Sequence, residues 1–308
     1  MCRPASGAMK TPGTMVCAMK ARGSARSEPP VNLWLRSDLR RRMDQFQINP
    51  VLQREEQTMS VNQLQNLSAT NSVGEWVAAD FRLASVFTRH GIDFCCGGGQ
   101  PVDQACAEHG IGLETLLHEA QVARMAVGSG EQYNQWAVDF LADYIVNQFH
   151  PYTREMLAQI NQYADAVANA HGAAHPETVT IAALWRPLRA TMTAHLRDEE
   201  ERLFPYIKQL AQRPTASGAT PLPAFGSAQA LIAQMGAEHE EVGATLGEIA
   251  RLSGGYAVPA DGCNTYRALY GFLSEFEATT KKHIHLENNI LFPKTVRLEQ
   301  AQAGVGAD

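Results

Sequence analysis

The segment from His283 to Pro293 reads His283-Ile-His-Leu-Glu287-Asn-Asn-Ile-Leu-Phe-Pro293, with an imidazole and a carboxylate four residues apart. The same spacing occurs 88 residues earlier, in His195-Leu-Arg-Asp-Glu199-Glu-Glu-Arg-Leu-Phe-Pro205. Residues four apart share one face of an α-helix, so each pair can direct both side chains at one point. The repeat therefore predicts two helices that each present a histidine and a glutamate to a common centre.

A second repeat surrounds two further histidines. His150 and His239 are each followed by a leucine seven residues later and by an isoleucine ten residues later. Glycine- and proline-rich breaks divide residues 131–300 into four segments with apolar stripes at helical spacing, and each segment carries one of the four histidines. The segments span about 131–170, 177–212, 227–253 and 262–299. We therefore expect an all-α fold, with an antiparallel four-helix bundle over 131–300.

The repeated residues have the composition of a metal centre. A single core histidine is usually structural, and a single His–Glu pair is usually a surface ion pair. A repeated pattern of four histidines and two glutamates favours metal binding instead. Six ligands are too many for one zinc ion and suit two metals that share carboxylates, and nitrogen and oxygen donors without thiolates favour iron or manganese. The predicted ligands are His150, His195, Glu199, His239, His283 and Glu287. We expect His285 to point away from the metals, and His171 and His175 to be solvated loop residues.

Residues 59–127 are predicted to form a small helical domain, joined to the bundle by a linker at Gly128–Gly130. Ser72 and Glu75 have the spacing of a helix capping box. The pair Cys95-Cys96 precedes three glycines and a helix that begins near Pro101. Because a helix N-terminus lowers a thiol pKa, we expect these two cysteines to be exposed redox thiols. Cys106 and Cys263 are expected to be inert helix residues.

The distribution of charge excludes several functions. Residues 1–58 hold 10 Lys and Arg against 5 Asp and Glu, whereas the rest of the chain has a net charge of −11. An acidic body is a poor partner for nucleic acid, and no apolar run is long enough to span a membrane. Residues 1–58 have no apolar core pattern, so we predict a disordered extension. Six cysteines, two of them adjacent, fit a reducing compartment better than a disulfide scaffold.

Two motifs resemble a known family. Residues from about 73 to 125, which include His90-Gly-Ile-Asp-Phe-Cys-Cys-Gly-Gly98, resemble the short N-terminal domain of the iron–sulfur cluster repair di-iron proteins. Residues 131–299, with Glu287-Asn-Asn-Ile-Leu-Phe-Pro293, are similar to the hemerythrin-like domain of that family. The resemblance implies two non-heme iron ions with oxo and carboxylate bridges, held by the six residues named above. It also implies a cytoplasmic stress-response protein that restores iron–sulfur clusters damaged by nitric oxide or oxidants.

The resemblance implies partners and leaves the activity open. Damaged or apo iron–sulfur proteins are the expected partners, and a homodimer is compatible with the pattern. An iron donor is favoured over a turnover enzyme, but a di-iron nitric oxide reductase or peroxidase would use the same ligands, as would an oxygen or iron sensor. The sequence departs from some relatives at Thr153, where they carry a histidine. Oxygen-carrying hemerythrins have a histidine where this chain has Gly243, which makes a carrier role less supported.

Overall fold

The computed structural model describes residues 68–125, 132–213 and 223–304. These residues all belong to one unit, Met59–Asp308. The predicted extension over 1–58 and the predicted linker at Gly128–Gly130 lie outside the described residues. Within the described ranges, the regular structure is helical, apart from one isolated bridge between Ser72 and Pro101. None of the helices described is both long enough and apolar enough to cross a membrane.

The first part of the described chain forms short helices. The capping box is confirmed, because Ser72 Oγ accepts a hydrogen bond from the Glu75 N–H while the Glu75 carboxylate accepts one from the Ser72 N–H. The second short helical stretch begins at Asp80, whose carboxylate caps the Arg82 N–H. The elements are α3 (Val73–Ala79), η1 (Phe81–Leu83), α4 (Ala84–Arg89), α5 (Val102–Glu108) and α6 (Leu113–Met125).

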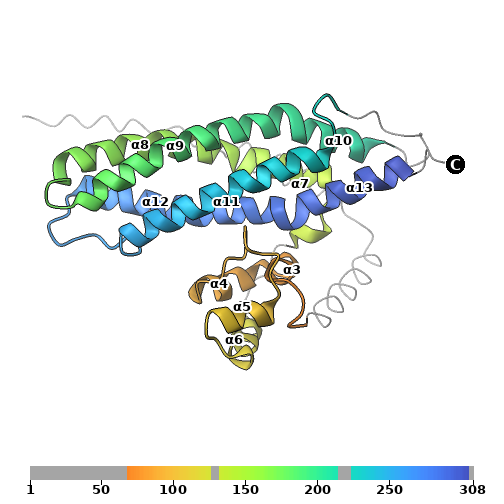
Figure 1. Ribbon diagram of the computed structural model, residues 1–308, viewed down its shortest axis with the longest axis horizontal. Helices are drawn as coiled ribbons and strands as arrows, with labels where there is room; N and C mark the ends of the chain where they lie inside the picture. The colour runs from red at the N-terminus through yellow and green to blue at the C-terminus, as the bar shows by residue number, and fades with distance from the viewer. Residues whose placement is uncertain (1–67, 126–131, 214–222, 305–308) are drawn as a thin grey trace, which may run out of the picture. The chain divides into compact units, whose positions relative to one another are not determined.

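The second part contains four long helices that pack side by side (Figure 1). They are α8 (His150–His171), α9 (Pro176–Asp198), α11 (Ala228–Leu252) and α12 (Asn264–Leu286). Shorter elements flank them: η2 (Tyr133–Gln135), α7 (Val138–Gln148), η3 (Glu199–Leu203), α10 (Phe204–Gln212), η4 (Glu287–Leu291) and α13 (Phe292–Gly304). The expected four-helix bundle after a small helical region is confirmed.

The apolar stripe over 131–170 predicted one long helix, but the structure divides this segment into two helices. Helix α7 ends at Gln148 and α8 begins at His150, with Phe149 as the junction. Pro151 accounts for the break, because proline has no N–H to continue the helical ladder and its ring disfavours helical geometry at the preceding residue. The break makes His150 the first residue of a new helix, which sets the direction of its side chain.

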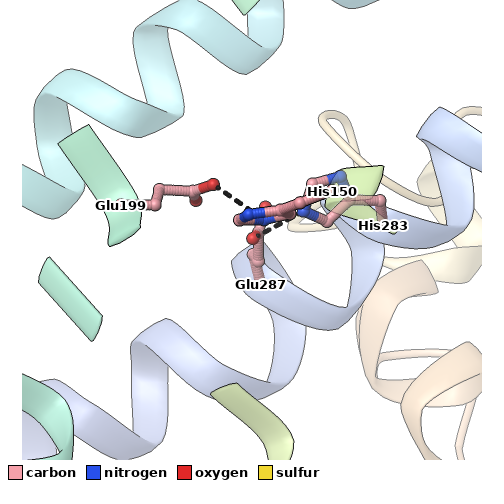
Figure 2. Close-up of side chains that lie close together, drawn as sticks. All are labelled: His150, Glu199, His283 and Glu287. Atoms are coloured by element: carbon pink, nitrogen blue, oxygen red, sulfur yellow. Dashed lines mark hydrogen bonds and ion pairs between the residues drawn. The ribbon is translucent and has the colours of Figure 1, made fainter. Parts of the chain in front are cut away.

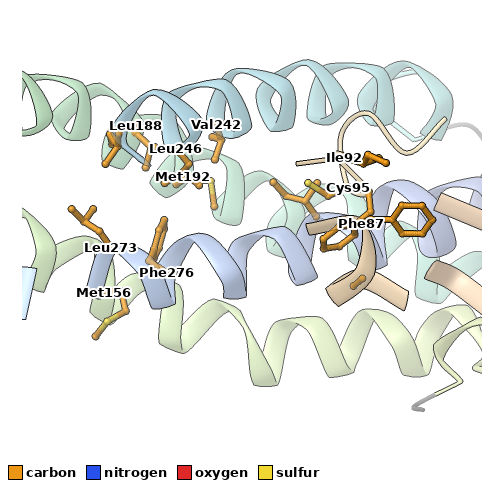
Figure 3. Packing of buried hydrophobic residues seen from close by; sticks show 14 of the residues in the cluster. Phe87, Ile92, Cys95, Met156, Leu188, Met192, Val242, Leu246, Leu273 and Phe276 are labelled. Atoms are coloured by element: carbon orange, nitrogen blue, oxygen red, sulfur yellow. The ribbon is translucent and has the colours of Figure 1, made fainter. Parts of the chain in front are cut away.

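Apolar side chains fill the bundle above and below the level of the polar residues. Leu188, Met192, Val242, Leu273 and Phe276 are among the buried residues that meet between the long helices (Figure 3). Burial of each such side chain stabilises the fold by roughly 1.5–3 kcal/mol. Polar groups within this apolar packing carry a desolvation cost. The buried histidines and glutamates of the bundle therefore need interactions that offset this cost.

Candidate metal centre

Each of the four long helices supplies one buried histidine to the middle of the bundle. His150 begins α8, His195 lies near the end of α9, His239 lies midway along α11, and His283 lies near the end of α12. All four are at most 2% exposed. The structure thus brings together the four histidines that the repeats predicted.

The two glutamates lie on unusual turns of helix. Glu199 and Glu287 begin the π-helical turns η3 and η4, in which Phe204 N–H donates to the Glu199 carbonyl and Phe292 N–H donates to the Glu287 carbonyl. Each turn is followed by a proline, which cannot donate to the carbonyl four residues earlier, so the regular ladder is interrupted at that point. Single π turns inside α-helices occur often at functional sites. The Leu-Phe-Pro repeat is therefore the local cause of the turns that aim the carboxylates inward.

One half of the centre combines His150 and His283 with both glutamates. One ligand atom from each of these four residues lies within 4.8 Å of the others. His150 Nε2 lies 3.4 Å from Glu199 Oε2, and His283 Nε2 lies 2.9 Å from Glu287 Oε1. Figure 2 shows the four side chains converging from different segments. This group has the size and the donor atoms of a single cation site.

The other half combines His195 and His239 with the same glutamates, again within 4.8 Å. His195 Nε2 lies 3.3 Å from Glu199 Oε1, and His239 Nε2 lies 3.3 Å from Glu287 Oε2. The two imidazole Nε2 atoms are 3.0 Å apart. Each glutamate therefore turns one oxygen toward each half. This is the arrangement that two carboxylate bridges between two metals require.

The burial of these groups tests whether they fit cations. Glu199 and Glu287 are 0% exposed. Both oxygens of Glu199, one oxygen of Glu287 and Nε2 of His150 have no hydrogen-bond partner within the described residues. Buried carboxylates need a compensating charge, and unpaired buried polar atoms are costly. The residues fit two cations bound by nitrogen and oxygen donors.

Outer partners hold three of the imidazoles by their Nδ1 atoms. Glu200 Oε1 lies 2.7 Å from His150 Nδ1, and Glu238 Oε2 lies 2.7 Å from His195 Nδ1. Asn288 Oδ1 lies 2.8 Å from His239 Nδ1. Acceptors in this position fix the ring orientation and leave Nε2 free to bind metal.

The sequence patterns do not single out Glu238 or Asn288, and they are compatible with Glu200 as either an exposed residue or an outer partner of a ligand. A signal was present in the repeat. Glu200 directly follows Glu199, and Asn288 directly follows Glu287. Glu238 directly precedes His239 but serves His195 on the neighbouring helix, a contact that depends on how α9 and α11 pack.

Neighbouring carboxylates favour the charged form of His195. Burial alone lowers the pKa of His195, but Glu199 and Glu238 outweigh it and raise that pKa well above its ordinary value. Burial likewise opposes the charged form of Glu199, whereas the neighbouring imidazoles His195 and His150 hold its pKa well below the usual range. The site is thus a cluster of mutually stabilised charges, from which an entering cation must displace protons.

The Cys95-Cys96 loop is ordered by Asp93. The Asp93 carboxylate accepts hydrogen bonds from the backbone N–H groups of Cys95, Cys96 and Gly97, at 2.8, 3.2 and 2.9 Å. Cys95 is 3% exposed, and contact with Cys96, burial and the Asp93 charge raise its pKa. The expectation of an exposed thiol with a lowered pKa is therefore wrong for Cys95, because the chain folds the loop inward. Cys96 is half-buried.

The same loop contacts the bundle beside a predicted ligand. Cys96 Sγ lies 3.3 Å from the carbonyl oxygen of His239. A Cβ added at Gly243 would lie 3.2 Å from that sulfur. The position at which oxygen-carrying hemerythrins have a further histidine is thus occupied here by a glycine and covered by the Cys96 thiol.

Polar side chains of α12 and η4 hold the loop in this place. Asn289 Nδ2 donates to the carbonyl oxygens of Phe94 and Cys95, at 3.4 and 3.2 Å. His285 is fully buried outside the two metal groups, with Nδ1 3.3 Å from the Phe94 carbonyl oxygen. Gly74 makes the close approach possible, since an added Cβ would lie 2.1 Å from Asn289 Oδ1.

Comparison with known proteins agrees with this geometry. The hemerythrin HHE cation binding domain matches residues 141–295, a range that contains all six converging residues. A domain of unknown function (DUF542) matches residues 69–123, which contain the two adjacent cysteines. Iron-sulfur cluster repair proteins YtfE from Yersinia pestis (strain Pestoides F) and Yersinia pseudotuberculosis serotype O:1b (strain IP 31758) are 32% identical over 228 residues. The match covers 74% of this chain and 97% of each relative. The chain belongs to the YtfE family. Separate family models match the two domains of this YtfE-family chain, and the Yersinia relatives align across both.

Proposed function

We propose that the chain binds two iron ions and uses them to restore damaged iron–sulfur clusters. The observation that carries the proposal is the pair of fully buried glutamates, each directed at two histidine pairs in the bundle core. The match to a cation-binding domain supports metal binding of some kind. The absence of thiolates among the six converging residues favours iron over structural zinc.

The six residues have distinct tasks in this proposal. Glu199 and Glu287 would contribute to both cation sites, His150 and His283 would complete one site, and His195 and His239 would complete the other. Glu200, Glu238 and Asn288 orient three of these rings through Nδ1. Bound iron supplies the metal that a damaged cluster has lost. Cluster repair is supported by relatives that are named iron-sulfur cluster repair proteins and that align over nearly their whole length.

The thiols serve as the first acceptor in this proposal. Cys96 Sγ lies beside the backbone of His239, so a thiol is positioned next to one half of the centre. Thiolates are soft ligands suited to iron in transit to a cluster. Cys95 is buried and hydrogen-bonded to Asp93, with an Sγ–Oδ1 distance of 3.0 Å, and it acts as the inner member of the pair. Damaged or apo iron–sulfur proteins are the partners.

The direct test is transfer of iron to a client. Iron-loaded protein is mixed with an iron–sulfur enzyme whose cluster has been destroyed by nitric oxide, with sulfide present and free iron held low by a weak chelator. We expect client activity to return in proportion to the iron lost from the protein, and metal-free protein to be inactive. Repeated consumption of nitric oxide or peroxide with a reductant, without loss of iron, would instead support a turnover enzyme.

A further inference from the structure

A second cluster of reactive groups lies where helix α8 ends and helix α12 begins. Cys263 is the N-cap residue of α12 and is exposed. His171 is the last residue of α8, and its Nε2 lies 3.2 Å from Cys263 Sγ. A cysteine paired with a histidine from another element is the constellation that activates thiols. Cys263 was expected to lie within a helix, but it caps the N-terminus of α12 instead.

The imidazole in this pair is held in place. Tyr266 is fully buried on the first turn of α12, and its ring contacts His171 edge-on, with centroids 5.4 Å apart. The same ring contacts His175, with centroids 5.7 Å apart, and the His175 Nε2 lies 3.0 Å from an Asp261 oxygen. The two histidines are therefore fixed between α8, α9 and α12 rather than simply solvated. Their predicted role as solvated loop residues is corrected accordingly.

The surroundings of the sulfur favour its anion. Hydrogen bonding from the Tyr266 backbone N–H, then from His171 and Thr265, lowers the pKa of the Cys263 thiol to about 7. A cysteine at the N-terminus of a 23-residue helix also benefits from the helix dipole. The other charged groups that face the cluster are His175, Glu177 and Asp261, and both carboxylates pair with His175. His175 lies in the α8–α9 connection, Glu177 lies on the first turn of α9, and Asp261 lies in the α11–α12 connection.

Cys263 differs from two other described cysteines in the direction of its pKa shift, and it lies outside the candidate metal groups. Burial raises the pKa of Cys106, and Cys95 is buried with a raised pKa. Among the described residues, Cys263 is not part of any group of side chains close enough together to bind one metal ion. The His171 and His175 rings are 6.3 Å apart, each bonded to a different partner. The geometry thus suits thiol chemistry better than metal binding.

We propose that Cys263 is a reactive thiolate that forms a reversible mixed disulfide with low-molecular-weight disulfides. The thiolate attacks one sulfur of a disulfide R–S–S–R, the S–S bond of the reagent breaks, and a Cys263–S–S–R bond forms. The departing R–S⁻ carries the electron pair and takes a proton from water. His171 is a positioning residue, because its Nε2–H stabilises the attacking anion. This site is independent of the proposed repair function.

The experiment uses the full chain, metal-loaded, with glutathione disulfide as the probe. After timed quenching by acid and alkylation, mass spectrometry of the Cys263 peptide gives its rate of modification at each pH. Because about half of this thiol is ionised near neutrality, against about 3% of an ordinary cysteine, we expect the rate to rise with a midpoint near pH 7. The same thiol in urea-unfolded protein should have its midpoint near pH 8.5.

Variants test the role of the pair. Cys263→Ser should abolish the adduct on that peptide. His171→Leu and His171→Gln should each move the midpoint upward by about one pH unit, whereas His118→Gln, on α6, should leave it unchanged. A midpoint that is the same in folded and unfolded protein would overturn the reactive thiolate. An unchanged midpoint in both His171 variants, with folding verified by circular dichroism, would overturn the positioning role of His171.

Discussion

At the scale of single residues, Glu199 and Glu287 are the two buried side chains that both histidine pairs share. Glu199 and Glu287 are completely buried, yet three of their four oxygens have no hydrogen-bond donor within the described residues. Each oxygen instead faces an imidazole at 2.9–3.4 Å. Burying two carboxylates has a desolvation cost that the imidazoles offset in part, and bound cations would offset it further.

Replacing either glutamate by leucine should therefore remove metal rather than unfold the chain. Because each carboxylate serves both halves of the centre, Glu199→Leu or Glu287→Leu should lose at least one of two metals per chain. Metal analysis and absorption spectroscopy of the iron-loaded protein measure this. Glu201→Gln, on the same π turn but exposed, is the matched control. Full metal content with an unchanged spectrum in both leucine variants would contradict the bridging role.

The outer partners allow a finer test at the same scale. Glu238→Gln keeps the size of the side chain but removes the charge that lies 2.7 Å from His195 Nδ1. Changes of this kind typically lower metal affinity about 10- to 100-fold. Competition with a chelator of known affinity measures the change. Glu241→Gln, exposed on the same helix, should show no effect. Equal affinities for the two variants would show that Glu238 does not orient a ligand.

The sequence predicted which residues gather but not how each is held. The repeats of His195 and His283 place the six side chains on inward faces, and the structure brings them together. Their role as metal ligands stays a prediction. Glu238 escaped the prediction because it acts across two helices, and no periodicity within one helix encodes such a contact.

At the scale of elements, the Leu-Phe-Pro motif explains the shape of the second and fourth helices. Both continue past their glutamate into a π turn and then into α10 or α13. The apolar stripe predicted long helices correctly. It could not predict the extra residue in the turn, because hydrophobic periodicity is insensitive to a single bulge. The break between α7 and α8 was likewise visible only as Pro151, which fits either a kink or a gentle bend.

Restoring the missing backbone donor should disturb the centre. Pro293→Ala supplies an N–H that can donate to the Asn289 carbonyl, so the π turn can relax to a regular α-helix. This change shortens the hydrogen-bonded turn from five residues to four, which rotates Glu287 by about 100° relative to α13. We expect lower metal occupancy and a smaller gain in melting temperature on adding iron. Calorimetry with and without metal measures both.

A control separates this effect from the general effect of removing a proline. Pro187 lies inside α9, away from the π turns, and is exposed. Pro187→Ala should leave metal occupancy unchanged, because no ligand depends on the local helix geometry there. If Pro187→Ala and Pro293→Ala lose metal equally, the π turn is not what directs the carboxylate.

At the scale of the whole described chain, the small N-terminal helices contribute a thiol to the edge of the bundle. Cys96 contacts α11 at the level of His239, and Asn289 anchors the loop from η4. The sequence predicted a small helical domain before the bundle and redox thiols at Cys95 and Cys96, and the thiol role stays a prediction. It did not predict that the loop would be buried, because the contact depends on Gly74 and Gly243, whose missing side chains make room for it.

This contact predicts separate roles in cluster repair for the bundle and for the small N-terminal helices. All six converging residues lie in the bundle, so Cys95→Ser combined with Cys96→Ser should keep its iron. The double variant should lose most client repair, because the His239 side of the centre would lack an adjacent thiol that could accept the metal. Cys263→Ser, which removes an exposed thiol at the other end of α12, should repair at the parent rate. Iron content and recovered client activity, measured on the same samples, distinguish transfer from loading. If the double variant repairs a client as fast as the parent protein, the thiols take no part in transfer and the bundle delivers iron by itself.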